Sequence, residues 1–136
     1  MARLLDGSGT QISLANGTTL WEVGINLPTM EGGGGVETTT LRNTTMRTRK
    51  PKTLKNLSEA SFSAQYDDAH AATIYSAINT NQEITITWPD ASTLKFWGWV
   101  DSVSFGEIVE GEAPTVDITI VCSNQDSETE KAPAFA

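Results

Sequence analysis

Alternating apolar and polar positions along most of the chain predict a protein built mainly of β-strands. In the segment TTLWEVGINLP, which begins at Thr18 and ends at Pro28, every second residue is large and apolar. Successive side chains of a strand point to opposite faces of the sheet. The pattern therefore predicts a half-buried strand whose apolar face is formed by Trp21, Val23, Ile25 and Leu27.

A second alternating segment, LSEASFSAQYD at residues 57–67, has one apolar face and one wholly polar face. Ala60, Phe62, Ala64 and Tyr66 share the apolar face. A strand face that is polar at every position is expected to face solvent or a hydrated interface. The polar face is formed by Glu59, Ser61, Ser63, Gln65 and Asp67.

The C-terminal half predicts two hairpins. QEITITW and TLKFWGWV are strands that flank a PDAS turn, with Pro89 and Asp90 at its central positions. Gly98 between two tryptophans indicates a bulge or a close approach of another backbone. The second hairpin, VDSVSFGEIVEGEAPTVDITIVCS, has an acidic loop, and its last strand alternates between two faces. Val116, Ile118, Ile120 and Cys122 form one face, and Asp117, Thr119 and Val121 the other.

One helix is predicted over residues 68–80. Asp67 or Asp68 is suited to the N-cap, where a carboxylate meets the positive end of the helix dipole. The apolar stripe has the i, i+3, i+4, i+7 spacing of a helix that packs on a sheet, and its members are Ala71, Ile74, Tyr75 and Ile78.

Together these segments predict a single domain over residues 1–136, a β-sandwich or small barrel of six or seven strands with one helix. VETTTL at 36–41 is a further β-branched strand, and four consecutive glycines at 32–35 predict a flexible turn or a close-packing point. Residues 1–10 and 124–136 are polar and without periodicity, which is typical of flexible arms. No apolar run reaches the roughly 18 residues of a membrane helix, and we expect no secretory signal.

Charge is distributed unevenly. The chain has a net charge of -8, yet six of its nine basic residues fall in one proline-containing stretch. A net acidic chain is unsuited to wrapping nucleic acid, although this stretch alone could touch phosphate. The pattern predicts a long basic loop at 42–56 that can pair with acidic surfaces on copies of the same chain. Its basic residues are Arg42, Arg47, Arg49, Lys50, Lys52 and Lys55.

Catalytic and cofactor chemistry is not indicated. The single histidine, His70, follows Asp67 and Asp68, but these side chains do not converge on one helix face and no second His or Cys completes a metal site. Cys122, the single cysteine, is expected to be an inert core thiol that forms no internal disulfide. Glycosidase chemistry at Glu107, Glu110 and Glu112 is disfavoured against a solvated acidic loop. We therefore expect neither an enzyme nor a cofactor.

The tryptophans leave two readings open. Trp97 and Trp99 could form a stacking platform for a sugar or a peptide. The favoured reading makes them core and interface residues, with at least one tryptophan buried at a subunit contact.

The organisation of nearly the whole chain resembles the major tail tube proteins of long-tailed, non-contractile bacteriophages of the lambda-type siphophage group. The resemblance rests on the N-terminal arm, the paired strands, the charged loop at 42–56 and the helix at 68–80. It rests above all on GWVDSVSFGEIVEGEAPTVDITIVCS, a strand ending in SFG, an acidic turn and an alternating strand.

The resemblance implies a structural subunit that forms hexameric rings, stacked into a tube through which DNA passes without specific binding. It implies tape measure, tail tip or baseplate, and tail terminator proteins as partners, and a place in the virion tail after synthesis in the host cytoplasm. The basic loop matches the segment that bridges rings, with an acidic partner surface at Glu107, Glu110 and Glu112. Matching lumen-facing positions are Glu37, Glu59, Ser61, Ser63, Gln65, Asp117 and Thr119.

A negative lining would repel phosphate, so that DNA slides through the tube. The residue pattern leaves open which polar face lines a lumen and which faces the outer solvent. Two alternatives also remain: a tube protein like that of the type VI secretion system, and a monomeric β-sandwich that binds a ligand on Trp97 and Trp99.

Overall fold

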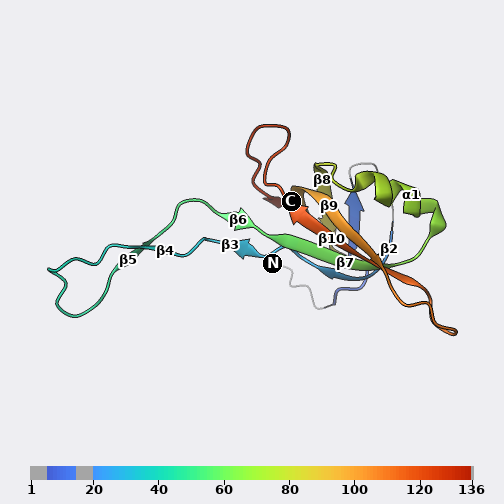
Figure 1. Cartoon of the computed structure of the whole chain (residues 1–136), viewed down its shortest axis with the longest axis horizontal. Coiled ribbons are helices and arrows are strands. Elements are labelled where there is room, and N and C mark those ends of the chain that lie inside the picture. Colours follow the sequence, from blue (N-terminus) through green and yellow to red (C-terminus); the bar gives the residue numbers. More distant parts are fainter. Residues whose placement is uncertain (1–5, 15–19, 136) are drawn as a thin grey trace.

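Antiparallel strands make up most of the secondary structure, and one helix covers an end of the sheet (Figure 1). The computed structural model describes residues 6–14 and 20–135, and only the backbone of residues 68–70. The predicted N-terminal arm and the start of the first predicted strand therefore lie partly outside the described residues. In chain order the elements are β1 (Gln11–Leu14), β2 (Trp21–Asn26), β3 (Met30–Glu31), β4 (Gly35–Glu37), β5 (Arg49–Pro51), β6 (Asn56–Leu57), β7 (Glu59–Gln65), α1 (Asp68–Ala77), β8 (Gln82–Thr87), β9 (Thr93–Phe105), β10 (Thr115–Cys122) and β11 (Ala134–Phe135).

The main sheet has the strand order β1-β8-β9-β10-β7-β2, with β11 added to β9. It curves so far that its two edge strands meet through a side chain: the Ile12 amide donates a hydrogen bond to Glu22 Oε1 over 3.0 Å. This contact joins β1 to β2 without a backbone ladder between them, so the sheet wraps around a core but does not close as a barrel. The prediction of a mainly β, sandwich-like fold with one helix is confirmed.

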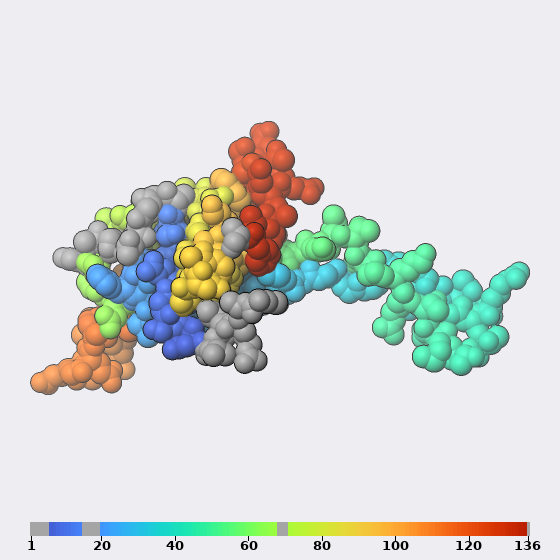
Figure 2. Space-filling view, turned by 180° about the vertical axis from the view of Figure 1, so that it is seen from behind, coloured from blue at the N-terminus to red at the C-terminus, as the bar shows by residue number. Residues whose placement is uncertain are grey.

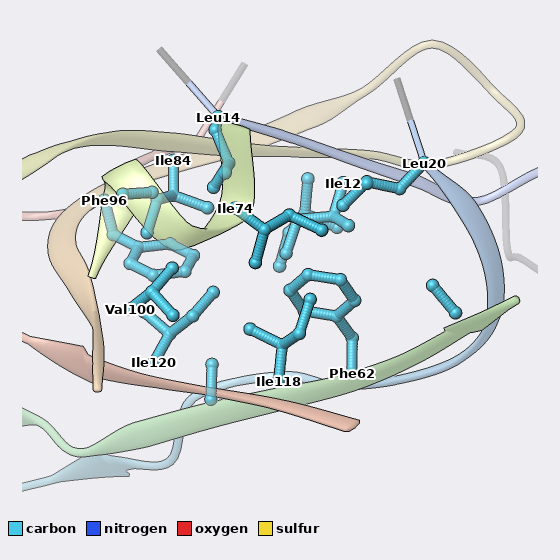
Figure 3. Close-up of a cluster of buried hydrophobic side chains, with 14 of the residues drawn as sticks. Ile12, Leu14, Leu20, Phe62, Ile74, Ile84, Phe96, Val100, Ile118 and Ile120 are labelled. Carbon is cyan, nitrogen blue, oxygen red and sulfur yellow. The ribbon is translucent and has the colours of Figure 1, made fainter. Parts of the chain in front are cut away.

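The core consists of the inward residues of the alternating strands (Figure 3). Register pairs Ile84 with Phe96 and Ile86 with Leu94, as the hairpin pattern predicts. Ile118 and Ile120 on β10 are also almost fully buried. Each buried aliphatic or aromatic side chain of this size contributes roughly 1.5–3 kcal/mol by leaving water.

Strand β2 differs from the prediction because its register shifts between Glu22 and Gly24. A bulge of this kind moves every later residue to the other face. Ile25 consequently lies opposite the inward residue Phe62, whereas Trp21, Val23 and Leu27 are exposed. The predicted apolar face of this strand is therefore wrong at three of its four positions.

Two tyrosines assigned to apolar faces also lie outside the core. Tyr75 is 78% exposed on α1, where Ile74 and Ala77 are the buried residues. Tyr66 follows the last residue of β7 and is exposed, and its ring meets Phe105 edge-on with a centroid distance of 6.1 Å. The helix ends at Ala77, three residues before its predicted end, and Asn79 follows with a φ of 61°.

Residues 27–56 form a long two-stranded projection, the basic arm, that extends away from the sheet (Figures 1 and 2). The predicted loop at 42–56 forms its tip and its returning half, which pairs with the outgoing half through β4–β5 and β3–β6. Hydrogen bonds from the Thr38 amide to the Thr48 carbonyl (2.9 Å) and from Asn43 Nδ2 to the Met46 carbonyl (2.9 Å) shape its tip. The predicted strand at 36–41 is thus limited to Gly35–Glu37.

The C-terminal residues fold back on the sheet. Ala134 and Phe135 pair with Lys95 and Leu94 of β9, beyond the point where β10 leaves that strand. The preceding loop is tied to the body by Asn81, whose Nδ2 donates to the Gln125 carbonyl over 3.0 Å and to the Asp126 carbonyl. The predicted C-terminal arm therefore contacts its own subunit, which a sequence without periodicity does not indicate.

Candidate assembly surfaces

The six basic residues of the basic arm are exposed to solvent. Arg42 and Arg47 lie at the tip, Arg49 and Lys50 in β5, and Lys52 and Lys55 nearer the body. All six are exposed, and within the described residues none of them forms an ion pair. The arm therefore presents a concentrated positive charge that its own subunit does not neutralise.

The acidic loop, residues 106–114, lies at the opposite end of the molecule from the basic arm (Figure 1). It joins β9 to β10 and is closed at its base by the Gly106 amide, which donates to the Thr115 carbonyl over 2.9 Å. Glu107, Glu110 and Glu112 are all exposed. The structure thus brings the three predicted acidic residues together and separates them from the cations along the long axis.

A polar face covers the outer side of β2, β7, β10 and β9. Ser63 Oγ donates to Asp117 Oδ1 over 2.6 Å, and Asn26 Nδ2 donates to Ser61 Oγ over 3.1 Å. Thr119 lies opposite Ser61 in register, and Glu59 and Gln65 occupy the two ends of β7 on the same face. These residues form a continuous hydroxyl- and carboxylate-bearing surface across β2, β7 and β10.

One predicted member of that face lies elsewhere, and three members, Asn26, Ser102 and Ser104, were missed. Glu37 belongs to β4 in the basic arm, so the structure does not bring it to the polar face. Ser102 and Ser104 of β9 pair with Thr119 and Asp117 and extend the face by one strand. The alternation in DSVSF at 101–105 was the signal that could have identified them.

An apolar groove opens between α1 and the far ends of β2, β7 and β9, beside the acidic loop. Its volume is about 270 Å³, and Ile74, Val103 and Ile118 are among the apolar side chains that line it. Trp21, Tyr66, Tyr75 and Phe105 also line the groove, and all four are exposed. The sequence pattern assigned three of these aromatic residues to other roles, and it did not predict a groove.

Trp97 and Trp99 are half-buried on the outer side of β9. They border a shallow hollow with Asn81 and the C-terminal loop at Gln125–Ser127. Within that loop the Ser127 and Thr129 amides donate to the Asp126 carboxylate over 2.6 and 3.2 Å. These hydrogen bonds hold the pKa of Asp126 below its usual value, so the loop keeps a negative charge beside the tryptophans.

Cys122 packs against the core cluster at the end of β10. Burial raises the pKa of its thiol to about 11, from 9.0. The thiolate is the nucleophilic form, so the folded protein holds this sulfur in its unreactive state at neutral and mildly alkaline pH.

We expect the native protein at pH 8 to react at least tenfold more slowly with iodoacetamide than the urea-unfolded chain. Because the folded state favours the protonated thiol, this group also reduces stability as the pH rises from about 9 towards 11. Alkylation followed by mass spectrometry over time checks the rate. Equal rates in the two states would show that the sulfur is accessible.

The described part of the chain shows neither a metal-binding cluster nor a helix that could span a membrane. There, no group of three or more His, Cys, Asp or Glu side chains could hold a metal ion. The side chain of His70 lies outside the described residues. No helix in the described ranges is long and apolar enough to cross a membrane.

Chains of similar fold are found in solved structures of phage-like particles. A chain in the virion of the native gene transfer agent (GTA) particle has a TM-score of 0.68 and 12% identity, covering 98% of this chain and 99% of that chain. A chain in the tail of the empty GTA particle, which has C6 symmetry, has a TM-score of 0.69, 12% identity and the same coverage of 98% and 99%.

A third similar chain comes from the 6-fold symmetrised baseplate of the anti-feeding prophage (AFP), with a TM-score of 0.57 and 8% identity over 93% of this chain and 90% of that chain. No protein family matches the sequence, and no curated protein matches it either. At these identities the likeness establishes the fold: this chain has the fold of subunits found in phage-like tails and baseplates.

Proposed function

We propose that this chain is a non-catalytic structural subunit of a phage tail, which assembles into hexameric rings that stack as the tail tube. The observation that carries the proposal is the separation of charge. The six cations of the basic arm and the three carboxylates of the acidic loop lie at opposite ends of one elongated molecule (Figure 1). Copies stacked head to tail bring these opposite charges together at every junction.

The fold supports the same proposal, because similar chains occur in a GTA tail of C6 symmetry and in a 6-fold symmetrised baseplate. A six-fold ring of this subunit would stack through the arm and the acidic loop. Such a subunit belongs to the virion tail, is made in the host cytoplasm, and meets tape measure, tail tip or baseplate, and terminator proteins.

We assign the polar face on β2, β7, β10 and β9 to the lumen. Glu59 and Asp117 give it negative charge, and its serines and threonines give it hydroxyl groups without a basic residue among its named members. Phosphates are repelled by such a lining, so DNA passes without binding. Glu37, in the arm, has no part in this lining.

Negative-stain electron microscopy of the concentrated protein, with light scattering, tests the proposal. Stacked rings or hollow tubes of six-fold symmetry are the expected result. A protein that remains monomeric at all concentrations, also after addition of a preformed tail tip complex, would overturn it. A ligand-binding role for Trp97 and Trp99 would then be examined with a Trp97→Ala variant.

Raised salt is expected to slow ring stacking. The cations and carboxylates at the two ends are exposed, and charges of this kind are screened beyond about 8–10 Å at roughly 0.1–0.15 M salt. The initial rate of light scattering should therefore fall several-fold between 50 and 500 mM NaCl. A rate that does not depend on salt would assign stacking to apolar contacts alone.

A further inference from the structure

The apolar groove beside α1 presents apolar and aromatic side chains to solvent. Its floor is the end of the hydrophobic core, and aromatic rings stand around it. The rim is held in place: Trp21 Nε1 donates to Asp67 Oδ2 over 3.1 Å, and Tyr66 meets Phe105 edge-on. Trp21 is nevertheless 61% exposed and Phe105 65% exposed. A contiguous apolar surface of this kind, bordered by charge, is typical of a protein interface.

The tip of the basic arm carries the matching protrusion. Leu41 and Met46 stand out from the arm without contact to the core, and Met46 is 73% exposed. The turn between them is shaped by Asn43, whose side chain accepts from the Thr40 amide and donates to the Met46 carbonyl. A shaped tip loses less conformational entropy on docking than a free loop does.

Charge complementarity identifies the partner. Arg42 and Arg47 are the sequence neighbours of Leu41 and Met46. On the groove side, Glu107 follows Phe105 by two residues and begins the acidic loop, with Glu110 beyond it. An arm tip that places its two apolar side chains in the groove therefore brings its arginines beside these carboxylates.

The occupant must be a second copy of this chain, because the arm tip lies at the opposite end of the molecule from α1 and the acidic loop (Figure 1), beside which the groove opens. A volume of about 270 Å³ exceeds the roughly 150 Å³ that accommodates a benzene molecule in an engineered cavity. The groove thus has room for an aliphatic side chain and part of a second one.

We infer that the groove lined by Trp21, Tyr66, Tyr75 and Phe105 receives Leu41 and Met46 from the basic arm of the next copy along the stack. This inference rests on the proposed function. It adds a buried apolar contact to the electrostatic attraction between the basic arm and the acidic loop. Attraction between exposed charges steers the encounter, and the buried leucine and methionine then hold the rings together.

Cross-linking between engineered cysteines tests the contact. A Met46→Cys/Tyr75→Cys double variant is assembled and treated with a short bismaleimide. We expect a ladder of covalent oligomers, because each arm meets the groove of another subunit. The single variants Met46→Cys and Tyr75→Cys are the controls for the half-buried Cys122, and we expect no ladder from either one.

A second pair of variants measures the strength of the contact. Leu41→Ser/Met46→Ser should raise the critical concentration for stacking at least tenfold, because two apolar side chains no longer leave water. Met30→Ser/Leu54→Ser, which changes exposed apolar residues nearer the body, should leave it within twofold.

The outcomes separate this inference from the proposed function. Tubes without a cross-linked ladder, together with unchanged stacking of Leu41→Ser/Met46→Ser, would overturn the groove contact and leave the tube proposal standing. A parent protein that forms neither rings nor tubes would overturn both.

Discussion

Replacement of residues 36–50 by an Asn-Gly turn is expected to give a folded protein that no longer stacks. The change removes the arm tip with Arg42 and Arg47, and with them the proposed contact to the next ring. Gly35 and Pro51 are register partners, so a two-residue turn can join them without moving the base of the arm. Electron microscopy should show monomers or single rings in place of tubes.

The thermal midpoint should stay within about 2 °C of the parent, because neither the core cluster nor the side chains packed against it include a residue between 26 and 56. Exposed substitutions rarely change stability by more than about 0.5 kcal/mol. A matched variant keeps the arm and removes charge alone, with Arg42, Arg47, Arg49 and Lys50 changed to Gln. We expect that variant to stack slowly but to completion. Tubes formed at the parental rate without residues 36–50 would exclude the arm as the connection between rings.

The elements predicted correctly from the sequence are those in which one face is buried and the other is exposed to solvent. Strands β7, β8 and β10 keep strict alternation, and their inward residues, such as Phe62, Ile84 and Ile118, are the buried ones. Burial of one face fixes the register, since a slip by one residue would expose the whole apolar set. The same rule located most of the polar face on the opposite side.

The elements predicted poorly are those in which tertiary contacts override the local pattern. In β2, Glu22 lies opposite the inward residue Ala64, and its carboxylate accepts from the Ile12 amide. The register shift before Gly24 then brings Ile25 to the same inward face. The basic arm has solvent on both sides, so its ladder leaves no apolar alternation to detect. The groove was missed for a related reason. Its aromatic residues come from four separate segments, and apolar patterns assign them to a core, whereas the structure leaves them exposed.

Gly98→Ala is expected to be the most destabilising single-methyl addition at a described glycine. A Cβ atom at this position would lie 2.5 Å from the Val121 carbonyl oxygen and 3.2 Å from Cys122 Cα. Both are backbone atoms of the neighbouring strand β10, so relief requires β9 and β10 to separate. Overpacking of this kind costs about 1–3 kcal/mol, and we expect a value near the upper end, measured as a shift of the urea midpoint.

Two glycines provide matched controls for this substitution. At Gly24, in β2, an added Cβ meets nothing within 4 Å, and at Gly106 the nearest atom, at 2.7 Å, is the hydroxyl oxygen of Thr115. Gly24→Ala should be neutral or slightly stabilising, because alanine reduces the entropy of the unfolded chain. Gly106→Ala should cost less than Gly98→Ala, since a side chain can rotate away whereas a backbone strand cannot.

The position of Gly98 also explains why Gly98→Ala should loosen the C-terminal loop at the surface. It pairs with Gln82 on one side and Cys122 on the other, so three strands meet at a residue without a side chain. Trp97, its neighbour, accepts a hydrogen bond from the Ser123 amide over 2.9 Å through its carbonyl. Separation of β9 from β10 would break this bond and release the C-terminal loop, which tryptophan fluorescence would detect below the unfolding transition. An unchanged urea midpoint in Gly98→Ala would mean that the two strands tolerate separation, and the predicted fluorescence change would then be absent as well.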